Sequence, residues 1–400
     1  MTAQRAQKYP GKPQEADDVL HRKADDILAA CIHCPKCREE CAFLEKYGSP
    51  AEMAETVDFR DPAFLRLSYE CSLCGLCQAV CPVDVNPAAL FLEMRRAAVR
   101  AGAGPLKPHR KLLAYENRGI SRRYGLYRIP SGCDTVFFPG CTASGTRPGQ
   151  VEALYAHLQK SDPAMGIVLN CCSKPSHDLG CQAQFLSRFG EMRSRLLENG
   201  IRRVIVACPN CYQVFSAYGG PLESETVYER LLQTGLPGRI QSIQGKDKPL
   251  ITIHDPCVLR DTPRIQTAIR QLAEKTGFDV VEMAHTGRKT LCCGEGGAVG
   301  LIDARLPQKW QNRRKQEAGG IRMATYCAGC AAALQTRPAT IHILDAIFAP
   351  ENARAGRSLW GRAARPPRTY WNRLRLKKRL KRKAHKKGGS TQDPTGIVKP

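Results

Sequence analysis

The sequence LCCGEGG at residues 291–297 stands between a lone Cys257 and the motif Cys327-Ala-Gly-Cys330. The same arrangement occurs earlier in the chain, as Cys141, the adjacent pair Cys171-Cys172 and Cys208-Pro-Asn-Cys211. The three elements are separated by 29 and 35 residues in the first copy and by 34 and 33 in the second. This regularity predicts an internal repeat of one cysteine-rich unit.

Each copy supplies five thiols, one more than a tetrahedral zinc site uses, and adjacent cysteines are poorly placed to bridge each other. A larger sulfur-ligated cofactor of iron and sulfide is therefore expected in each repeat. The expected ligands of the first repeat are Cys141, Cys171, Cys172, Cys208 and Cys211. Those of the second are Cys257, Cys292, Cys293, Cys327 and Cys330.

Two further cysteine runs with the spacing C-x2-C-x2-C-x3-C precede the repeats, the second of them followed by Pro82. This is the spacing of bacterial two-cluster ferredoxins, in which the fourth cysteine of each run binds the other cluster. Zinc ribbons are the alternative. The crossed assignment predicts two cubane [4Fe-4S] clusters, one held by Cys31, Cys34, Cys37 and Cys81, and the other by Cys71, Cys74, Cys77 and Cys41.

The fold class predicted by the pattern is α/β. Short β-branched runs end at the repeat cysteines and alternate with helical segments such as residues 150–160 and 182–197, which favours a parallel sheet in each copy. Cysteines at the carboxyl ends of such strands would converge on one crevice. The ferredoxin part is expected to be mostly helical, with helices at residues 16–30 and 86–100, the second capped by Asn86.

The expected domains are a helical ferredoxin-like part at 1–100, a connector at 101–131, repeats at 132–245 and 246–350, and a basic, flexible tail at 351–400. From residue 352 the tail holds sixteen Lys or Arg against one acid, so most of the net charge of +24 lies there. Trp371, Leu374, Leu376 and Leu380 interrupt these cations, and a helix there could lie on anionic lipid. A solvated tail is the alternative. No nucleic-acid partner is expected, because no recognised nucleic-acid-binding motif accompanies the charge.

The polar start of the chain, residues 1–18, has no apolar segment, and no run of eighteen apolar residues follows. We therefore expect reduced, metal-bound thiols in the cytoplasm, with contact at the cytoplasmic membrane face through the tail. A glycine-rich nucleotide fingerprint and a P-loop are both absent from the sequence. Electrons are therefore expected to come from a flavoprotein or cytochrome partner.

With FPGC (138–141), HDPC (254–257), CCGEGG (292–297) and TYCAGC (325–330), the chain resembles iron–sulfur proteins with two cysteine-rich CCG domains. The D-type subunit of heterodisulfide reductase is one of these, and others are the electron-transfer subunit of anaerobic glycerol-3-phosphate dehydrogenase and the glycolate oxidase iron–sulfur subunit. The resemblance covers about residues 25–350. It implies one or two noncubane [4Fe-4S] clusters in the repeats and anaerobic electron transport.

One departure from the pattern is Ser173, which replaces the glycine after the first cysteine pair and lacks its backbone freedom. The second repeat is therefore the expected place of the chemistry. There Gly294, Gly296 and Gly297 would let backbone amides approach a cluster or substrate, and a flexible turn is the alternative. His254 would donate a proton to a leaving thiolate, or be structural.

Arg260 and Lys174 would hold an anionic substrate group, or be surface charges. Cys133 and Cys181 match no motif position and are expected to be free, buried thiols.

Two functions follow from the resemblance. The first is an iron–sulfur oxidoreductase that reduces a disulfide, as in heterodisulfide reductase, alone or as a subunit of a complex. The second is a non-catalytic conduit that passes electrons from a flavin-dependent glycerol-3-phosphate, glycolate or lactate-type dehydrogenase to quinone. The ten repeat cysteines favour the first, and the basic tail favours the second.

Overall fold

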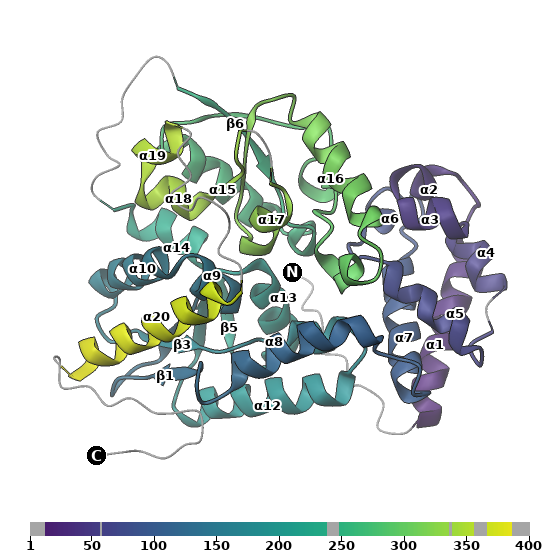
Figure 1. The fold of residues 1–400 in the computed structure, drawn as a ribbon, viewed down its shortest axis with the longest axis horizontal. Helices are drawn as coiled ribbons and strands as arrows, with labels where there is room; N and C mark the ends of the chain where they lie inside the picture. Colours follow the sequence, from purple (N-terminus) through teal and green to yellow (C-terminus); the bar gives the residue numbers. More distant parts are fainter. Residues whose placement is uncertain (1–12, 57, 238–247, 336–337, 356–365, 386–400) are drawn as a thin grey trace.

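The computed structural model describes residues 13–56, 58–237, 248–335, 338–355 and 366–385. A helical N-terminal part is followed by two α/β parts, each built around its own small sheet (Figure 1). This confirms the predicted fold class of a helical ferredoxin-like part followed by two α/β repeats. The polar residues 1–12 and the last residues of the tail, 386–400, lie outside the described residues.

The N-terminal part packs short helices around two long ones, α1 and α7. The predicted cap is present, because the Asn86 side-chain oxygen accepts a hydrogen bond from the Ala89 amide at 3.1 Å and Pro87 occupies the first turn. Phe43 and Phe91 meet edge to face in the core. Its elements are α1 (Pro13–Ala30), α2 (Lys36–Glu40), α3 (Ala42–Tyr47), α4 (Pro50–Glu55), α5 (Pro62–Leu67), η1 (Ser68–Glu70), α6 (Leu76–Ala79) and α7 (Pro87–Arg100).

The first repeat has a sheet of order β1-β3-β2-β4-β5, in which only β1 is antiparallel to its neighbour. The strands are β1 (Leu126–Arg128), β2 (Thr135–Phe138), β3 (Gly166–Leu169), β4 (Arg203–Val206) and β5 (Glu223–Thr226). Its helices are α9 (Cys141–Thr146), α10 (Pro148–Ser161), α11 (Lys174–Asp178), α12 (Gln182–Glu198), α13 (Pro209–Tyr218) and α14 (Val227–Thr234). The fully buried strands β2 and β3 explain their unbroken apolar sequences.

The second repeat has an all-parallel sheet of order β7-β6-β8-β9. Without β1, the two sheets have the same strand order, so the sequence repeat is also a repeat of topology. The strands are β6 (Leu250–His254), β7 (Asp279–Val281), β8 (Arg322–Thr325) and β9 (Ile341–His342). The helices are η3 (Cys257–Leu259), α15 (Pro263–Lys275), η4 (Gly287–Lys289), η5 (Gly296–Leu301), α16 (Arg305–Glu317), α17 (Ala328–Ala333), α18 (Ile343–Phe348) and α19 (Pro350–Arg354).

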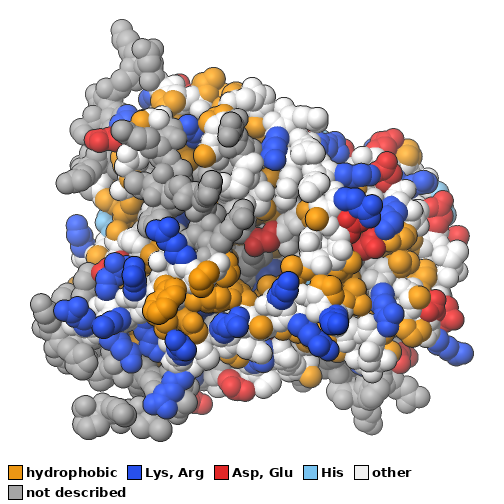
Figure 2. Space-filling view, viewed as in Figure 1, with side chains coloured by type: hydrophobic (Ala, Val, Ile, Leu, Met, Phe, Trp, Pro, Cys, Tyr) orange, Lys and Arg blue, Asp and Glu red, His pale blue; other side chains and the backbone are white. Residues whose placement is uncertain are grey.

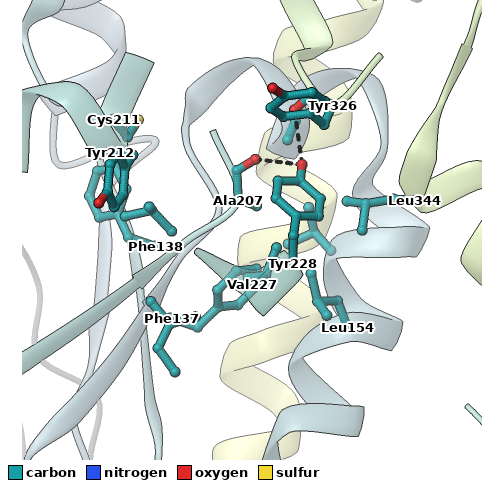
Figure 3. Close-up of a cluster of buried hydrophobic side chains, with 14 of the residues drawn as sticks. Phe137, Phe138, Leu154, Ala207, Cys211, Tyr212, Val227, Tyr228, Tyr326 and Leu344 are labelled. Carbon is teal, nitrogen blue, oxygen red and sulfur yellow. Dashed lines mark hydrogen bonds between the residues drawn. The ribbon is translucent and has the colours of Figure 1, made fainter. Parts of the chain in front are cut away.

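The two repeats share one continuous hydrophobic core. At its centre the buried Tyr228 hydroxyl donates to the carbonyl oxygen of Ala207, just after β4, and to that of Tyr326, just after β8, each at 2.9 Å (Figure 3). One hydroxyl proton serves both oxygens, so Tyr228 holds the equivalent strand ends of the two repeats together. This brings the cysteine-bearing loops after both strands to the same side of the junction.

The expected connector and tail are more ordered than predicted. Residues 101–131 form η2 (Lys107–His109), α8 (Arg110–Ile120) and β1, which joins the first sheet because Leu126 and Tyr127 are buried there. The described end of the expected flexible tail is helix α20 (Arg368–His385), which packs on α9 and α10. Leu376 and Leu380, expected to face lipid, are buried against the protein. Among the described residues, no helix has the length and apolar composition to cross a membrane.

Candidate metal centres

The eight cysteines of the ferredoxin-like part line two small cavities. One is lined by Cys31, Cys34, Cys37 and Cys81, together with Cys77. The other is lined by Cys41, Cys71, Cys74 and Cys77, together with Cys292 of the second repeat. The fourth cysteine of each run thus lies with the first three of the other run, in the grouping that the spacing predicts. That each group holds a cubane cluster stays a prediction.

The repeat cysteines follow the carboxyl ends of strands, so the strands of each sheet deliver them to one edge. In the first repeat the lone Cys141 contacts Cys171, and Cys172 contacts Cys211 of the C-x-x-C motif. The second repeat reproduces these contacts with Cys257 to Cys292 and Cys293 to Cys330. The two cysteines of each adjacent pair also contact each other, as do the two of each C-x-x-C motif, so in each repeat five sulfurs form one continuous group.

This donor set suits a metal–sulfur cofactor. Hydrogen bonds with neighbouring cysteines lower the pKa of Cys172 to about 6 and hold that of Cys293 well below its usual value. The same hydrogen bonds, with burial, raise the pKa of the partners Cys211, Cys292 and Cys330, so each group shares protons that a bound metal would displace. Thiolates, not thiols, are the form that binds metal. All twenty cysteines, including Cys133 and Cys181, are free of disulfides. The residues present thus fit a sulfur-ligated cluster in each repeat.

One cavity of about 190 Å³ joins the two repeat sites. Besides repeat cysteines from both units it is lined by Lys174, Glu295 and Tyr115, and by Ser72 and Leu73 of the ferredoxin-like part. Nine of the ten repeat cysteines line it, namely Cys141, Cys171, Cys172, Cys208, Cys211, Cys257, Cys293, Cys327 and Cys330. The cavity is the place where both sites could act on one molecule.

The remaining repeat cysteine, Cys292, faces the ferredoxin-like part instead. Its sulfur lies within hydrogen-bonding distance of Cys74, one of the cysteines expected to hold the second cubane cluster. Arg260 reinforces this contact by donating to the Cys74 carbonyl at 2.8 Å and to the Thr290 carbonyl at 3.2 Å. Arg260 is therefore used to join the two parts, so it is not free to bind a substrate as the sequence suggested.

Of the other candidate residues, His254 is fully buried, and one of its ring nitrogens lies within 4.8 Å of the sulfurs of Cys293 and Cys330. The matching position of the first repeat is Phe138, so this histidine distinguishes the two sites. Lys174 lines the cavity and pairs with Asp178 at 2.9 Å. Glu295, which lies inside the CCGEGG sequence, lines the cavity with an exposed side chain, and partial desolvation there raises its pKa to about 8.

The glycines of the second repeat permit close packing of protein on protein. A Cβ at Gly296 would lie 2.6 Å from the Ser72 carbonyl oxygen, and one at Gly297 would collide with the Cys71 carbonyl. A Cβ at Gly294 would lie 2.6 Å from Cβ of Pro307. These glycines therefore let the loop pack closely against the ferredoxin-like part and against α16. Gly296 and Gly297 also line the cavity.

Ser173 and Gly294 occupy matching positions, and both have left-handed backbone, with φ of 58° and 83°. We predict that Ser173→Gly stabilises the protein by up to about 1 kcal/mol, because it removes left-handed strain and a buried hydroxyl without a partner. The reverse change Gly294→Ser should destabilise by about 2–3 kcal/mol through the contact with Pro307. Melting temperatures of the two variants would test this, and equal shifts would contradict it.

Sequence reasoning missed Arg95, although the structure places it where all three parts meet. Its guanidinium is fully buried and donates to the backbone carbonyls of Ser68, Asp178 and Gly297, one from each part, and also to that of Cys71. Helix α7 carries it as one of several basic residues with no recognisable motif. No sequence signal separates Arg95 from Arg96 or Arg100.

Comparison with known proteins agrees with this organisation. The family model of the 4Fe-4S dicluster domain matches residues 27–85, and that of the cysteine-rich domain matches residues 135–216 and 251–335. One relative is the fumarate reductase (CoM/CoB) of Methanothermobacter marburgensis, one of whose subunits is 30% identical to this chain over 320 residues. That match covers 72% of this chain and 62% of the relative.

Two other relatives are more distant. The dihydromethanophenazine:CoB–CoM heterodisulfide reductase of Methanosarcina barkeri has a D-type subunit that is 25% identical, with 68% of this chain and 79% of the relative covered. EtfAB:quinone oxidoreductase of Syntrophomonas wolfei is 23% identical, and the chain spans 43% of its length. The relatives thus share an iron–sulfur architecture but carry names for different reactions.

Proposed function

Because this chain belongs to the iron–sulfur proteins with cysteine-rich CCG domains and is an electron-transfer oxidoreductase component, we propose that it reduces a disulfide in the cavity between its two repeats. Electrons enter through the ferredoxin-like domain and leave into the bound disulfide. The observation that carries the proposal is that nine of the ten repeat cysteines line a single cavity.

The cysteine groups would hold four clusters: two cubanes in the ferredoxin-like domain, and one further [4Fe-4S] cluster, noncubane in type, in each repeat. Such clusters supply single electrons, and an iron of a repeat cluster supplies a Lewis acid for sulfur. Reducing one disulfide to two thiols takes two electrons and two protons. Two repeat sites facing one cavity can each contribute one of those electrons to the same substrate.

The contacts of Cys292 favour entry through the second repeat. Cys74 and Cys292 touch, so an electron leaving the second ferredoxin group meets the second repeat first. His254 lies fully buried at the sulfur of Cys293 on this route, and desolvation lowers its pKa, so the ring there would be a neutral imidazole. Lys174 pairs with Asp178 in the cavity wall, so it would offer an anionic substrate group only the ammonium hydrogens that Asp178 leaves open.

The partner is proposed to be a flavoprotein or a cytochrome, because the relatives bear the names of parts of larger oxidoreductases and the sequence has no nucleotide fingerprint. A location on the cytoplasmic face of the membrane belongs to the same proposal. The basic helix α20 presents Trp371, 60% exposed, beside its cations, and Figure 2 shows many Lys and Arg side chains on the lower left of this face.

Anaerobic assays of the full chain test the proposal. Protein with all four clusters should contain about sixteen irons and as many labile sulfides. It should then oxidise reduced methyl viologen when the CoM–CoB heterodisulfide, cystine or glutathione disulfide is added. If none of these disulfides is reduced by protein with full iron content, while menadione accepts electrons readily, disulfide reduction is wrong and the chain is a conduit to quinone.

A further inference from the structure

Helix α20 lies outside the segments matched by the two family models, yet it is built into the first repeat. The Asn372 side chain donates to the Gly145 carbonyl at 2.8 Å, and the Lys377 ammonium donates to the Arg122 carbonyl at 2.6 Å. Leu376 and Leu380 are completely buried on the same side. In Figure 1 the yellow helix runs beside α9, whose first residue is the cluster candidate Cys141.

Arg373 extends from α20 toward the first repeat site. It is 2% exposed, and its Nη2 donates to the Gly119 carbonyl at 3.3 Å. Its guanidinium carbon lies 5.9 Å from the ring centre of Tyr115 and 5.5 Å from that of Tyr124. Its Nη1 is buried without a hydrogen-bond partner, and no carboxylate among the described residues forms an ion pair with it.

The cysteines of the first repeat lie beside this unpaired charge. Gly119 separates them: a Cβ there would lie 2.9 Å from Cβ of Cys171 and 3.6 Å from Nη2 of Arg373. Tyr115, under the guanidinium, is a hydrogen-bond partner of the Cys141 sulfur. The charge of Arg373 also acts electrostatically on Cys141. One buried cation thus faces the two cysteines that begin the first cluster group.

A purely structural role explains the contact with Gly119 but not the charge. Burying an unpaired cation costs several kcal/mol unless an opposite charge compensates it. A cluster on the first repeat's thiolates would supply that charge, because each thiolate adds one negative charge. Adding an electron makes such a site more negative still, and a fixed cation nearby favours that state.

We propose that Arg373 is a positioning charge that raises the reduction potential of the cluster held by the first repeat. Arg373 is not part of the cysteine pattern and comes from α20, outside the segments that the family models match. The inference rests on the proposed cluster in that repeat, though not on which substrate is reduced. It gives the two repeats different potentials, because the buried cation near the second repeat's cysteines, Arg314, is neutralised by an ion pair with Glu317 at 2.9 Å.

Redox titration of the anaerobic full chain, followed by electron paramagnetic resonance, tests this inference. The relevant signal is the one that Cys208→Ser removes; if no such signal and no matching iron exist, the proposed first-repeat cluster fails instead. At a fixed applied potential, Arg373→Met should lower the ratio of reduced to oxidised cluster on the order of tenfold. For a one-electron couple this means that the reduction potential of the cluster falls by about 59 mV. The other cluster signals should keep their potentials.

The matched control is Arg379→Met, on the same helix but 48% exposed in its side chain and paired with Glu152, which should leave the potential unchanged. Arg373→Lys and Arg373→Gln both lose the planar fork, but only the lysine keeps the charge. The lysine variant should retain most of the potential and the glutamine variant should not. Equal potentials for these two, an unshifted Arg373→Met, or loss of first-repeat iron from all three would overturn the proposal.

Discussion

Replacing Arg95 with methionine is expected to destabilise the protein by about 3–5 kcal/mol and to loosen the ferredoxin-like domain from both repeats. The guanidinium donates to carbonyls of Ser68, Asp178 and Gly297, at distances between 2.7 and 3.2 Å. Methionine fills a similar volume but leaves these buried acceptors without a donor, at about 1–3 kcal/mol each. The variant no longer has to bury a charged guanidinium, and this gain offsets part of the cost. The expected decrease in the free energy of unfolding therefore stays at about 3–5 kcal/mol.

Calorimetry and electron transfer should both report this loss. The wild-type chain is expected to melt with its domains coupled, whereas Arg95→Met should show a separate, earlier transition for the ferredoxin-like domain. Electron passage from that domain to the repeats should slow in parallel, because the contact of Cys74 with Cys292 depends on the same docking. The matched control is Arg305→Met, whose side chain is 87% exposed and which should cost less than about 0.5 kcal/mol. A melting profile of Arg95→Met identical to that of the control would contradict the argument.

The cysteines show what sequence could predict. The spacing of the cysteines was enough to predict that Cys41 groups with the second run and Cys81 with the first. Such spacing is a local property of the chain, so it can be read from the sequence. The parallel α/β character of the repeats followed from apolar runs that end at cysteines, whereas their strand order was not predicted. The left-handed backbone at Ser173 was not predicted, because serine lacks the backbone freedom that glycine has at the matching position.

The junction between the parts could not be predicted in the same way. Arg95 bonds to residues 83 and 202 positions away, and no local pattern marks such a partner. Helix α20 was misjudged for a different reason. Its composition is typical of a solvated tail, yet Arg373, Leu376 and Leu380 recur at intervals of three and four, which is the spacing of one helix face. The many Lys and Arg residues at the other positions of α20 made the whole segment look solvated, so the buried face was not recognised.

Replacing Cys293 with alanine is expected to lower disulfide reduction by at least about 100-fold, the effect of losing a ligand at the reacting site. Its sulfur is where three features meet: the pair with Cys292, the contact with Cys330 and the ring of His254. It also lines the cavity, whereas Cys292 faces the ferredoxin-like domain. Loss of Cys293 therefore removes the ligand between the electron entry point and the substrate.

Two readouts separate this effect from misfolding. Viologen oxidation by a disulfide should fall, while the signals of the two ferredoxin clusters stay unchanged. The oxidised wild-type protein should show a paramagnetic signal that added coenzyme M perturbs, and this signal should be absent from oxidised Cys293→Ala. Cys133→Ala is the matched control, because Cys133 is also a buried thiol but its hydrogen bond goes to the Thr135 carbonyl, away from the cavity. If the thiol-sensitive signal instead survives in Cys293→Ala and vanishes in Cys172→Ala, the substrate is bound at the first repeat, beside the charge of Arg373.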